Sequence, residues 1–435
     1  MSDNSASSSG SGKSKRTAHL SPASNLHIWV SQWSRKDVEK ELQIYCSDTA
    51  VTPSSILEKI TNEELSEKQS EYMEKVKRYL NFDIKFMELI LSQSVAHYPA
   101  TGITQHLKDV IKDTIERSLK DPDRFVRSTI REFMIAVQTL SRKCEEYRTH
   151  LKKTIYEGTF TRFISDFAVL CCLKPECTLG NAKGEPSIWE NFRGLQCAIS
   201  NPDIRLMKRG LPEEFCSSCE ETEWPVVSIV EVKMPSDLKF MNESGRDSVD
   251  ELARRMEFTK LKPSAGNSSS SESTSSDNLS ADLSRVCRKK KSSSNVTISS
   301  RFLPIYNSNK VFGQHAGELL FDLNRCLKDS NAKVGRMPGM IIDGVKVIFT
   351  LLEIRVSHLE KLRKNQKLND DDKALIYYSI PYDVFNQTDR NIVMEYFIKL
   401  NNVKSYGYNE LEVTPSASED SAYSSDVDHA KSVDS

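Results

Sequence analysis

The sequence lacks net charge and long apolar runs. Its 60 Lys and Arg residues are balanced by 61 Asp and Glu residues, which gives a formal net charge of −1 over 435 residues. A balanced charge provides no overall attraction to nucleic acid, so DNA or RNA binding would need a local basic face. No apolar run reaches the roughly 18 residues that a membrane span requires, and the Ser-rich start lacks the apolar core of a secretory signal. We therefore expect an intracellular protein without membrane contact, with a nuclear location left open.

Disulfides are also not expected, although the sequence contains ten cysteines, because the predicted compartment is reducing. Cys216 and Cys219 have the spacing of metal ligands, but no second pair follows at a fitting distance. Two interpretations stay open: a zinc site completed by Cys171, Cys172 and Cys177, or a set of free thiols. The sequence contains no Walker-type phosphate-binding loop and no nucleophile elbow, which argues against the NTPase and hydrolase classes that depend on them.

Composition divides the chain into segments of different character. Residues 1–24 have almost nothing to bury and are predicted to be disordered. Residues 25–150 show helical periodicity and are predicted to form a helical region. Residues 151–400 are predicted to form an α/β domain that carries a disordered Ser-rich insertion at about 262–300. Residues 410–435 are predicted to form a disordered acidic tail, and the Ser-rich and acidic segments are candidates for binding protein partners.

The predicted elements follow from apolar spacing and turn residues. In the first half, a helix is predicted within Glu64–Leu91, and Asp121-Pro122-Asp123 is predicted to separate two further helices. In the second half the pattern alternates between helices and short strands. Helices are predicted at about 157–170, 311–328 and 392–400, and strands at 196–199, 203–206, 226–232, 340–342 and 345–356, with a turn at Asp343-Gly344.

The most informative residues are Pro202-Asp203 and the strand sequence Glu231-Val232-Lys233. Side chains alternate along a strand, so Glu231 and Lys233 share one face and Val232 packs on the other. The apolar run Val226–Val230 predicts a buried central strand, where a carboxylate and an ammonium group are costly unless they are paired or hold a metal. Two carboxylates with backbone oxygen and water suit Mg²⁺ or Mn²⁺. Taken alone, Glu231-x-Lys233 is more often a structural ion pair.

Two further polar residues flank this pair in the sequence. Glu157 begins a helix and is interpreted either as an inward-pointing carboxylate or as an ordinary acid favoured by the helix dipole. Gln314 opens a later helix with small residues at Gly313, Ala316 and Gly317, which are predicted to let that helix lie close to the sheet and bring Gln314 near the carboxylates. The neighbouring His315 is interpreted as a hydrogen-bonded helix residue rather than as part of the site.

The order of these parts resembles the PD-(D/E)XK restriction-endonuclease-like superfamily over roughly residues 150–355, excluding the Ser-rich insertion. It also looks similar to domains of fungal or oomycete Crinkler-type and mobile-element proteins. The resemblance implies an α/β fold with a mixed central sheet flanked by helices. It implies a divalent metal held by Asp203 and Glu231, joined by Glu157 as the helix carboxylate. It further implies Lys233 as the catalytic lysine and Gln314 as an auxiliary residue.

The function that the resemblance implies is a nuclease dependent on Mg²⁺ or Mn²⁺. It would hydrolyse phosphodiester bonds in nucleic acid, with DNA favoured over RNA. The alternative is a catalytically inactive protein with the same fold that serves as an interaction or effector scaffold, because fold and activity are separable.

Overall fold

The computed structural model describes residues 26–86, 100–149, 155–177, 188–192, 194–211, 226–233, 308–327 and 332–403. Every structural statement below concerns these residues. The three segments predicted to be disordered, at 1–24, 262–300 and 410–435, lie outside them, as do Cys216 and Cys219.

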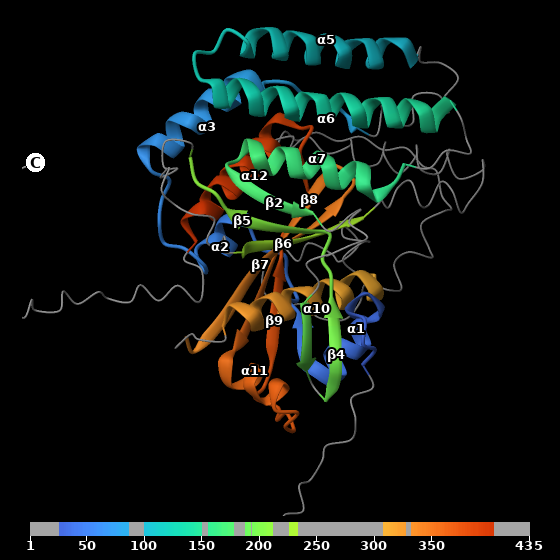
Figure 1. The fold of residues 1–435 in the computed structure, drawn as a ribbon, viewed down its shortest axis with the longest axis vertical. Helices are drawn as coiled ribbons and strands as arrows, with labels where there is room; N and C mark the ends of the chain where they lie inside the picture. Colours follow the sequence, from blue (N-terminus) through green and yellow to red (C-terminus); the bar gives the residue numbers. More distant parts are fainter. Residues whose placement is uncertain are drawn as a thin grey trace, which may run out of the picture.

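A mixed sheet of eight strands forms the centre of the fold, in the order β1-β9-β8-β7-β6-β5-β2 with β10 beside β8 (Figure 1). The β6–β7 and β1–β9 pairs are parallel and the other pairs are antiparallel. A separate two-stranded sheet is formed by β3 and β4. The strands are β1 (Ile44–Cys46), β2 (Leu173–Cys177), β3 (Ile188–Phe192), β4 (Leu195–Ser200), β5 (Ile204–Lys208), β6 (Val226–Lys233), β7 (Val334–Asp343), β8 (Lys346–Arg355), β9 (Ala374–Tyr378) and β10 (Tyr382–Asp383).

Helices cover both faces of the large sheet, which confirms the predicted mixed α/β class (Figure 1). One face packs against α2 (Pro53–Leu57), α7 (Glu157–Leu170) and α12 (Gln387–Lys399). Outside these helices lie α3 (Glu67–Tyr79), α6 (Arg124–Thr149) and α5 (Ala100–Ser118), with α6 packed on α7 and α5 packed on α6 (Figure 1). The other face packs against η1 (Val30–Gln32), α1 (Arg35–Asp37), η2 (Val38–Leu42), α10 (Asn309–Cys326) and α11 (Val356–Arg363). A short turn of helix, η5 (Leu400–Asn402), follows α12.

The central strands β6 and β7 are buried on both faces, which explains their nearly continuous apolar sequences. On β6, Val230 and Val232 pack into the core beneath α7, whereas Ile229 packs into the core beneath α10. Strand periodicity therefore directs Glu231 and Lys233 toward α10. This confirms that Val232 packs on the opposite face from the two charged residues.

The prediction that residues 25–150 are helical was wrong at β1, which joins the sheet beside β9. This three-residue strand pairs with β9, more than three hundred residues away in the sequence. Local periodicity therefore could not predict it. The predicted helix within Glu64–Leu91 was also wrong at residues 80–85, since α3 ends at Tyr79; residues 87–91 lie outside the described residues. Beyond the helix, the buried guanidinium of Arg390 donates hydrogen bonds to the backbone carbonyls of Leu80 and Phe82, which satisfies these carbonyls outside a helix.

The glycines of α10 have a different role from the predicted one. A Cβ atom on Gly313 would lie 2.4 Å from the backbone of Ser34, and one on Gly317 would lie 2.5 Å from the side chain of Val30. The absence of side chains at these glycines therefore lets the N-terminal segment, and not the sheet, pack closely against α10. The close approach of α10 to the sheet is made at Gly339 of β7, where a Cβ atom would lie 2.6 Å from Leu319.

A buried ion pair fixes α10 to β5. The Nε atom of Arg205 donates to Oδ1 of Asp322 at 2.8 Å, and Nη2 donates to Oδ2 at 3.3 Å. Both side chains are 2% exposed. Removing one partner of a buried pair leaves an uncompensated charge, which costs about 3–5 kcal/mol, whereas replacing both by apolar groups costs much less.

We therefore expect Arg205→Met to lower the free energy of unfolding by about 3 kcal/mol or more in urea titrations. The double variant Arg205→Met/Asp322→Leu should recover a large part of that loss. Lys364→Met removes an exposed pair with Glu360 and should change stability by less than about 1 kcal/mol. A double variant as unstable as the single one would contradict this account of the pair.

Candidate metal-dependent hydrolytic site

Antiparallel pairing of β5 and β6 brings the two sequence motifs together. Ile204 lies opposite Val230 in the register, so Asp203, one residue earlier, reaches the level of Glu231. The backbone N–H of Val232 donates a hydrogen bond to Oδ2 of Asp203 at 2.7 Å. The structure thus brings Pro202-Asp203 beside Glu231-Val232-Lys233, where the sequence predicted them to converge.

Glu231 and Lys233 form an ion pair on the α10 side of β6. The Glu231 side chain is fully buried, and that of Lys233 is 14% exposed. The ammonium group therefore lies between the buried carboxylate and the margin of the site. A buried carboxylate with an adjacent cation is electrostatically tolerable, but its strong interactions depend on exclusion of water.

Gln314 reaches this cluster through a residue that sequence reasoning missed. Its Nε2 atom donates to Oε1 of Glu318 at 2.9 Å, one turn further along α10. Glu318 is 1% exposed, and its carboxyl group interacts with that of Glu231. The signal available in the sequence was the Gln314-x-x-x-Glu318 spacing, which places an acid on the apolar face of a helix.

Glu157 lies at the margin of the cluster rather than inside it. It is the first residue of α7, and its side chain is exposed. Its negative charge nevertheless raises the pKa of both Asp203 and Lys233. Of the five predicted site residues, Asp203, Glu231 and Lys233 therefore form the centre, while Gln314 and Glu157 act from its two sides.

Burial and mutual repulsion change the protonation of these acids. Burial, reinforced by the charge of Asp203, raises the pKa of Glu231 to about 7 despite the opposing effect of Lys233. Burial and the charge of Glu231 raise the pKa of Glu318 well above its ordinary value. Burial also raises the pKa of Asp203, against the N–H of Val232. The raised pKa values of Glu231 and Glu318 favour the protonated form of these neighbouring acids, which reduces the negative charge that the site must hold.

Burial has the opposite effect on the pKa of Lys233, because its charged form is the protonated one. Burial lowers its pKa, but Glu231, Asp203 and Glu157 outweigh burial and raise the pKa above the ordinary value. Lys233 is therefore a permanent cation in this arrangement. It is suited to neutralising negative charge and cannot act as a proton acceptor while these acids surround it.

His315 is a buried residue of α10 directed at the sheet. Its Nε2 atom is hydrogen-bonded to Oγ1 of Thr350 on β8 at 2.8 Å. Burial and the charge of Lys233 lower its pKa to about 3, so the imidazole is neutral. This confirms the interpretation of His315 as a hydrogen-bonded helix residue, since the bond fastens α10 to the sheet beside the cluster.

The donor chemistry of the cluster fits a hard divalent cation. Asp203 and Glu231 supply carboxylate oxygens, and neither Glu231 oxygen has a hydrogen bond of ordinary geometry among the described residues. Mg²⁺ is commonly held by one or two carboxylates and retains several waters. In the part of the chain that the structure describes, no three His, Cys, Asp or Glu side chains are grouped to hold a metal. The three-carboxylate set with Glu157 is therefore not assembled here, and Asp203 with Glu231 is the pair that fits.

The cysteines within the described residues do not form a metal centre. Cys171 and Cys172 are buried and form no disulfide, and Cys177 is hydrogen-bonded to Ser165 at 3.1 Å. Burial raises the pKa of Cys171 and Cys177, which disfavours the thiolate that zinc requires. The free-thiol interpretation therefore suits these three residues better than the zinc interpretation.

Comparison with protein-family models, curated proteins and solved structures found no match to this chain. Its functional interpretation therefore depends on the geometry of the site. Within the described residues, no helix combines the length and apolar character needed to cross a membrane.

The raised pKa of Glu231 predicts a specific pH dependence of stability. The folded state holds this proton up to about pH 7, whereas an unfolded Glu loses it near pH 4.3. Because the folded state binds more protons across this window, stability falls as pH rises through it. Glu231→Gln should remove that fall, so its stability relative to the unmodified protein should rise by about 1–3 kcal/mol between pH 4 and pH 8.

Urea titrations at the two pH values measure the difference. The control is Glu360→Gln, at an acid whose side chain is 50% exposed on α11, which should show no comparable change with pH. A relative stability of Glu231→Gln that is the same at both pH values would contradict the assignment of a raised pKa to Glu231.

Proposed function

We propose that this chain is a divalent-metal-dependent nuclease that hydrolyses phosphodiester bonds in nucleic acid, with DNA favoured over RNA. The observation that carries the proposal is the convergence of Asp203, Glu231 and Lys233 at adjoining ends of two neighbouring strands. Two carboxylates and one obligatory cation at a single buried point form an unusual set for a purely structural ion pair, which needs only one acid.

Each residue has a role that follows from its surroundings. Asp203 and Glu231 would hold Mg²⁺ or Mn²⁺, which would supply charge stabilisation and an activated water. Lys233 would place its ammonium group against the scissile phosphate and offset the charge that develops there. Gln314 would orient Glu318, which in turn contacts Glu231 and limits the positions that this carboxylate can adopt. Glu157 would add negative charge at the margin of the site.

The order of the surrounding elements supports the proposed family. Helix α7 carries Glu157 and is followed by the antiparallel strands β2, β5 and β6, which carry the two motifs. Helix α10 then carries Gln314 and leads to β7, which is parallel to β6, and the β7–β8 hairpin closes the unit. This is the order in which the sequence resembles the PD-(D/E)XK superfamily, and the arrangement of these elements around one sheet supports membership.

A specific observation favours the second candidate, an inactive protein with the same fold. Lys233 is paired with Glu231, and Glu318 lies against the same carboxylate, so the buried charges already compensate one another. Such a cluster could stabilise a scaffold without binding a metal. The two candidates differ in whether Mg²⁺ or Mn²⁺ produces cleavage.

We expect the purified full chain to nick supercoiled plasmid when Mg²⁺ or Mn²⁺ is present and to stop when EDTA is added. Asp203→Asn and Lys233→Met should each lower the rate by about 100-fold or more, because each removes charge that acts on the transition state. Rates are measured by gel densitometry, and thermal melting checks that each variant is folded.

The matched control is Lys361→Met, which also removes a lysine paired with an acid, in this case Asp372 at 2.7 Å. It lies on α11, outside the cluster, and should leave the rate unchanged. Cleavage by Asp203→Asn and Lys233→Met at the unmodified rate would show that the site is assigned wrongly. A folded protein that cleaves neither DNA nor RNA with either metal would favour the scaffold.

A further inference from the structure

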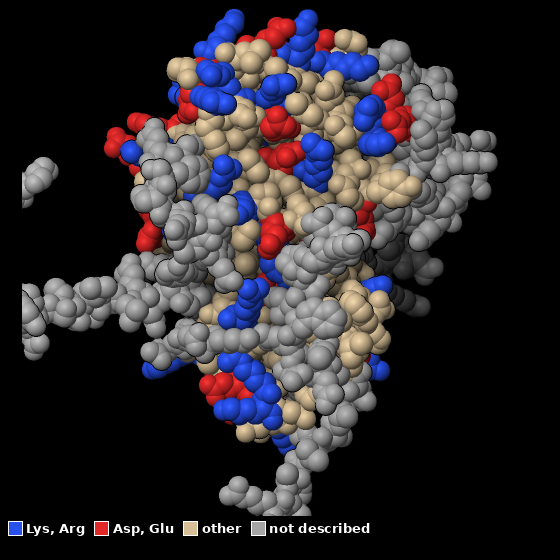
Figure 2. Space-filling model, in the orientation of Figure 1, with Lys and Arg blue, Asp and Glu red and all other residues tan. Residues whose placement is uncertain are grey.

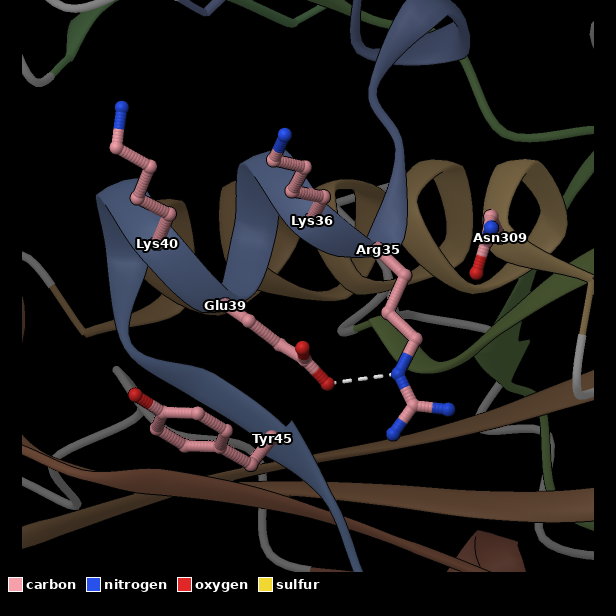
Figure 3. Close-up of a pocket in the computed structure, with 6 residues that line it drawn as sticks. All are labelled: Arg35, Lys36, Glu39, Lys40, Tyr45 and Asn309. Atoms are coloured by element: carbon pink, nitrogen blue, oxygen red, sulfur yellow. Dashed lines mark hydrogen bonds and ion pairs between the residues drawn. The ribbon is translucent and has the colours of Figure 1, made fainter.

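A basic pocket lies at the beginning of α10, on the side of the helix that faces the N-terminal segment (Figure 3). Its volume is about 640 Å³. The pocket is lined by Arg35, Lys36, Glu39, Lys40, Tyr45 and Asn309. These residues come from the continuous helical segment of α1 and η2, from β1 and from the first turn of α10, so the N-terminal segment and α10 meet around the pocket.

The charges of the lining favour an anion. Three of the six side chains are cationic, and the single acid, Glu39, is already engaged with Nε of Arg35 at 2.6 Å. Figure 3 shows Lys36 and Lys40 extending side by side from one flank of the helical segment, away from this pair. Both lysines are exposed, and Lys40 also contacts Glu41 at 3.2 Å. The Tyr45 hydroxyl and the Asn309 amide add hydrogen-bond donors.

Packing fixes the pocket to the helix that carries the candidate site. The Arg35 guanidinium lies over the ring of Phe312 at 5.3 Å, and Gly313 admits the backbone of Ser34. Asn309 is the first residue of α10, and Glu318 follows nine residues later. At 1.5 Å per residue the two are roughly 14 Å apart along the helix axis.

A cationic pocket held on the same helix as Gln314 and Glu318 is placed to contact the backbone of a nucleic acid bound at the candidate site. Contacts with the backbone a few steps from the reacting bond fix the register of a substrate without reading its sequence. On the face drawn in Figure 2, Lys and Arg side chains are interspersed with Asp and Glu. On this face, backbone binding would rely on a local cationic site.

We infer that the basic pocket binds a backbone phosphate of the nucleic-acid substrate, away from the bond at the Asp203–Glu231–Lys233 cluster. This inference rests on the proposed function, because it assigns the pocket to the same substrate. Lys36 and Lys40 supply mobile ammonium charges to the phosphate, and Arg35 is held in place by Glu39 and Phe312. The contribution to affinity is independent of base sequence and decreases with salt.

The test measures binding of the full chain to a fluorescent 20-base-pair duplex by anisotropy, in EDTA so that no cleavage occurs. Lys36→Ala/Lys40→Ala should weaken binding by about 5-fold or more at low salt, and the slope of log affinity against log salt should fall by about 2. The matched control is Lys108→Ala/Lys112→Ala, which also removes two exposed lysines one turn apart, here on α5. It should leave both affinity and slope unchanged.

The outcomes separate the pocket from the candidate site. If the pocket variant binds duplex as tightly as the unmodified chain, the inference is wrong, even when the unmodified chain cleaves plasmid. If the pocket variant loses duplex binding but the unmodified chain cleaves nothing, the phosphate contact stands and the nuclease proposal fails. The inference is also overturned if the pocket variant loses binding of inorganic pyrophosphate while its duplex affinity is unchanged, because the pocket would then take a free phosphate.

Discussion

Burial of the Glu231 carboxylate in the centre of an eight-stranded sheet is the constraint on which the surrounding structure depends. A carboxylate without water must be neutralised, paired or protonated, because transfer of an isolated charge into the protein interior is very unfavourable. Two of these responses are present. Lys233 supplies the opposite charge, and burial raises the pKa of Glu231 to about 7, which favours its protonated form. Asp203, at the start of the neighbouring strand, adds a second negative charge and raises the pKa of Glu231 further.

Helix α10 links the cluster to the rest of the fold. Gln314, Glu318 and Asp322 occur at four-residue intervals, so they form one stripe along the helix. Gln314 and Glu318 meet the cluster, and Asp322 pairs with Arg205 of β5. The flank of the helix that carries Gly313 and Gly317 admits the N-terminal segment, which forms the basic pocket. One helix therefore fixes the carboxylates, the sheet and the pocket relative to one another.

Local patterns were sufficient to predict the strands and residues that converge. An apolar run that ends in Glu231-Val232-Lys233 could only be a buried strand with charges on one face, and the fold has that arrangement. Glu318 was not predicted: the Gln314-x-x-x-Glu318 spacing places an acid on the apolar face of a helix, but its significance depends on a contact between α10 and Glu231 of β6, which that spacing does not reveal. The same reason applies to β1, whose pairing with β9 is non-local, and to Gly313, whose neighbour is a segment about 280 residues earlier. Local periodicity records which side of an element is buried, but not what covers it.

The protonation of Lys233 decides between the roles that a lysine can take in a hydrolytic site. A lysine that removes a proton from water needs a lowered pKa, which burial alone would give. Here Glu231, Asp203 and Glu157 outweigh burial, so the ammonium form is the stable one. The same carboxylates that create the demand for a cation therefore prevent Lys233 from acting as a base. In this structure Lys233 is the counter-charge of Glu231. In the proposed nuclease it would become the counter-charge of a phosphate once a divalent cation bound the two carboxylates.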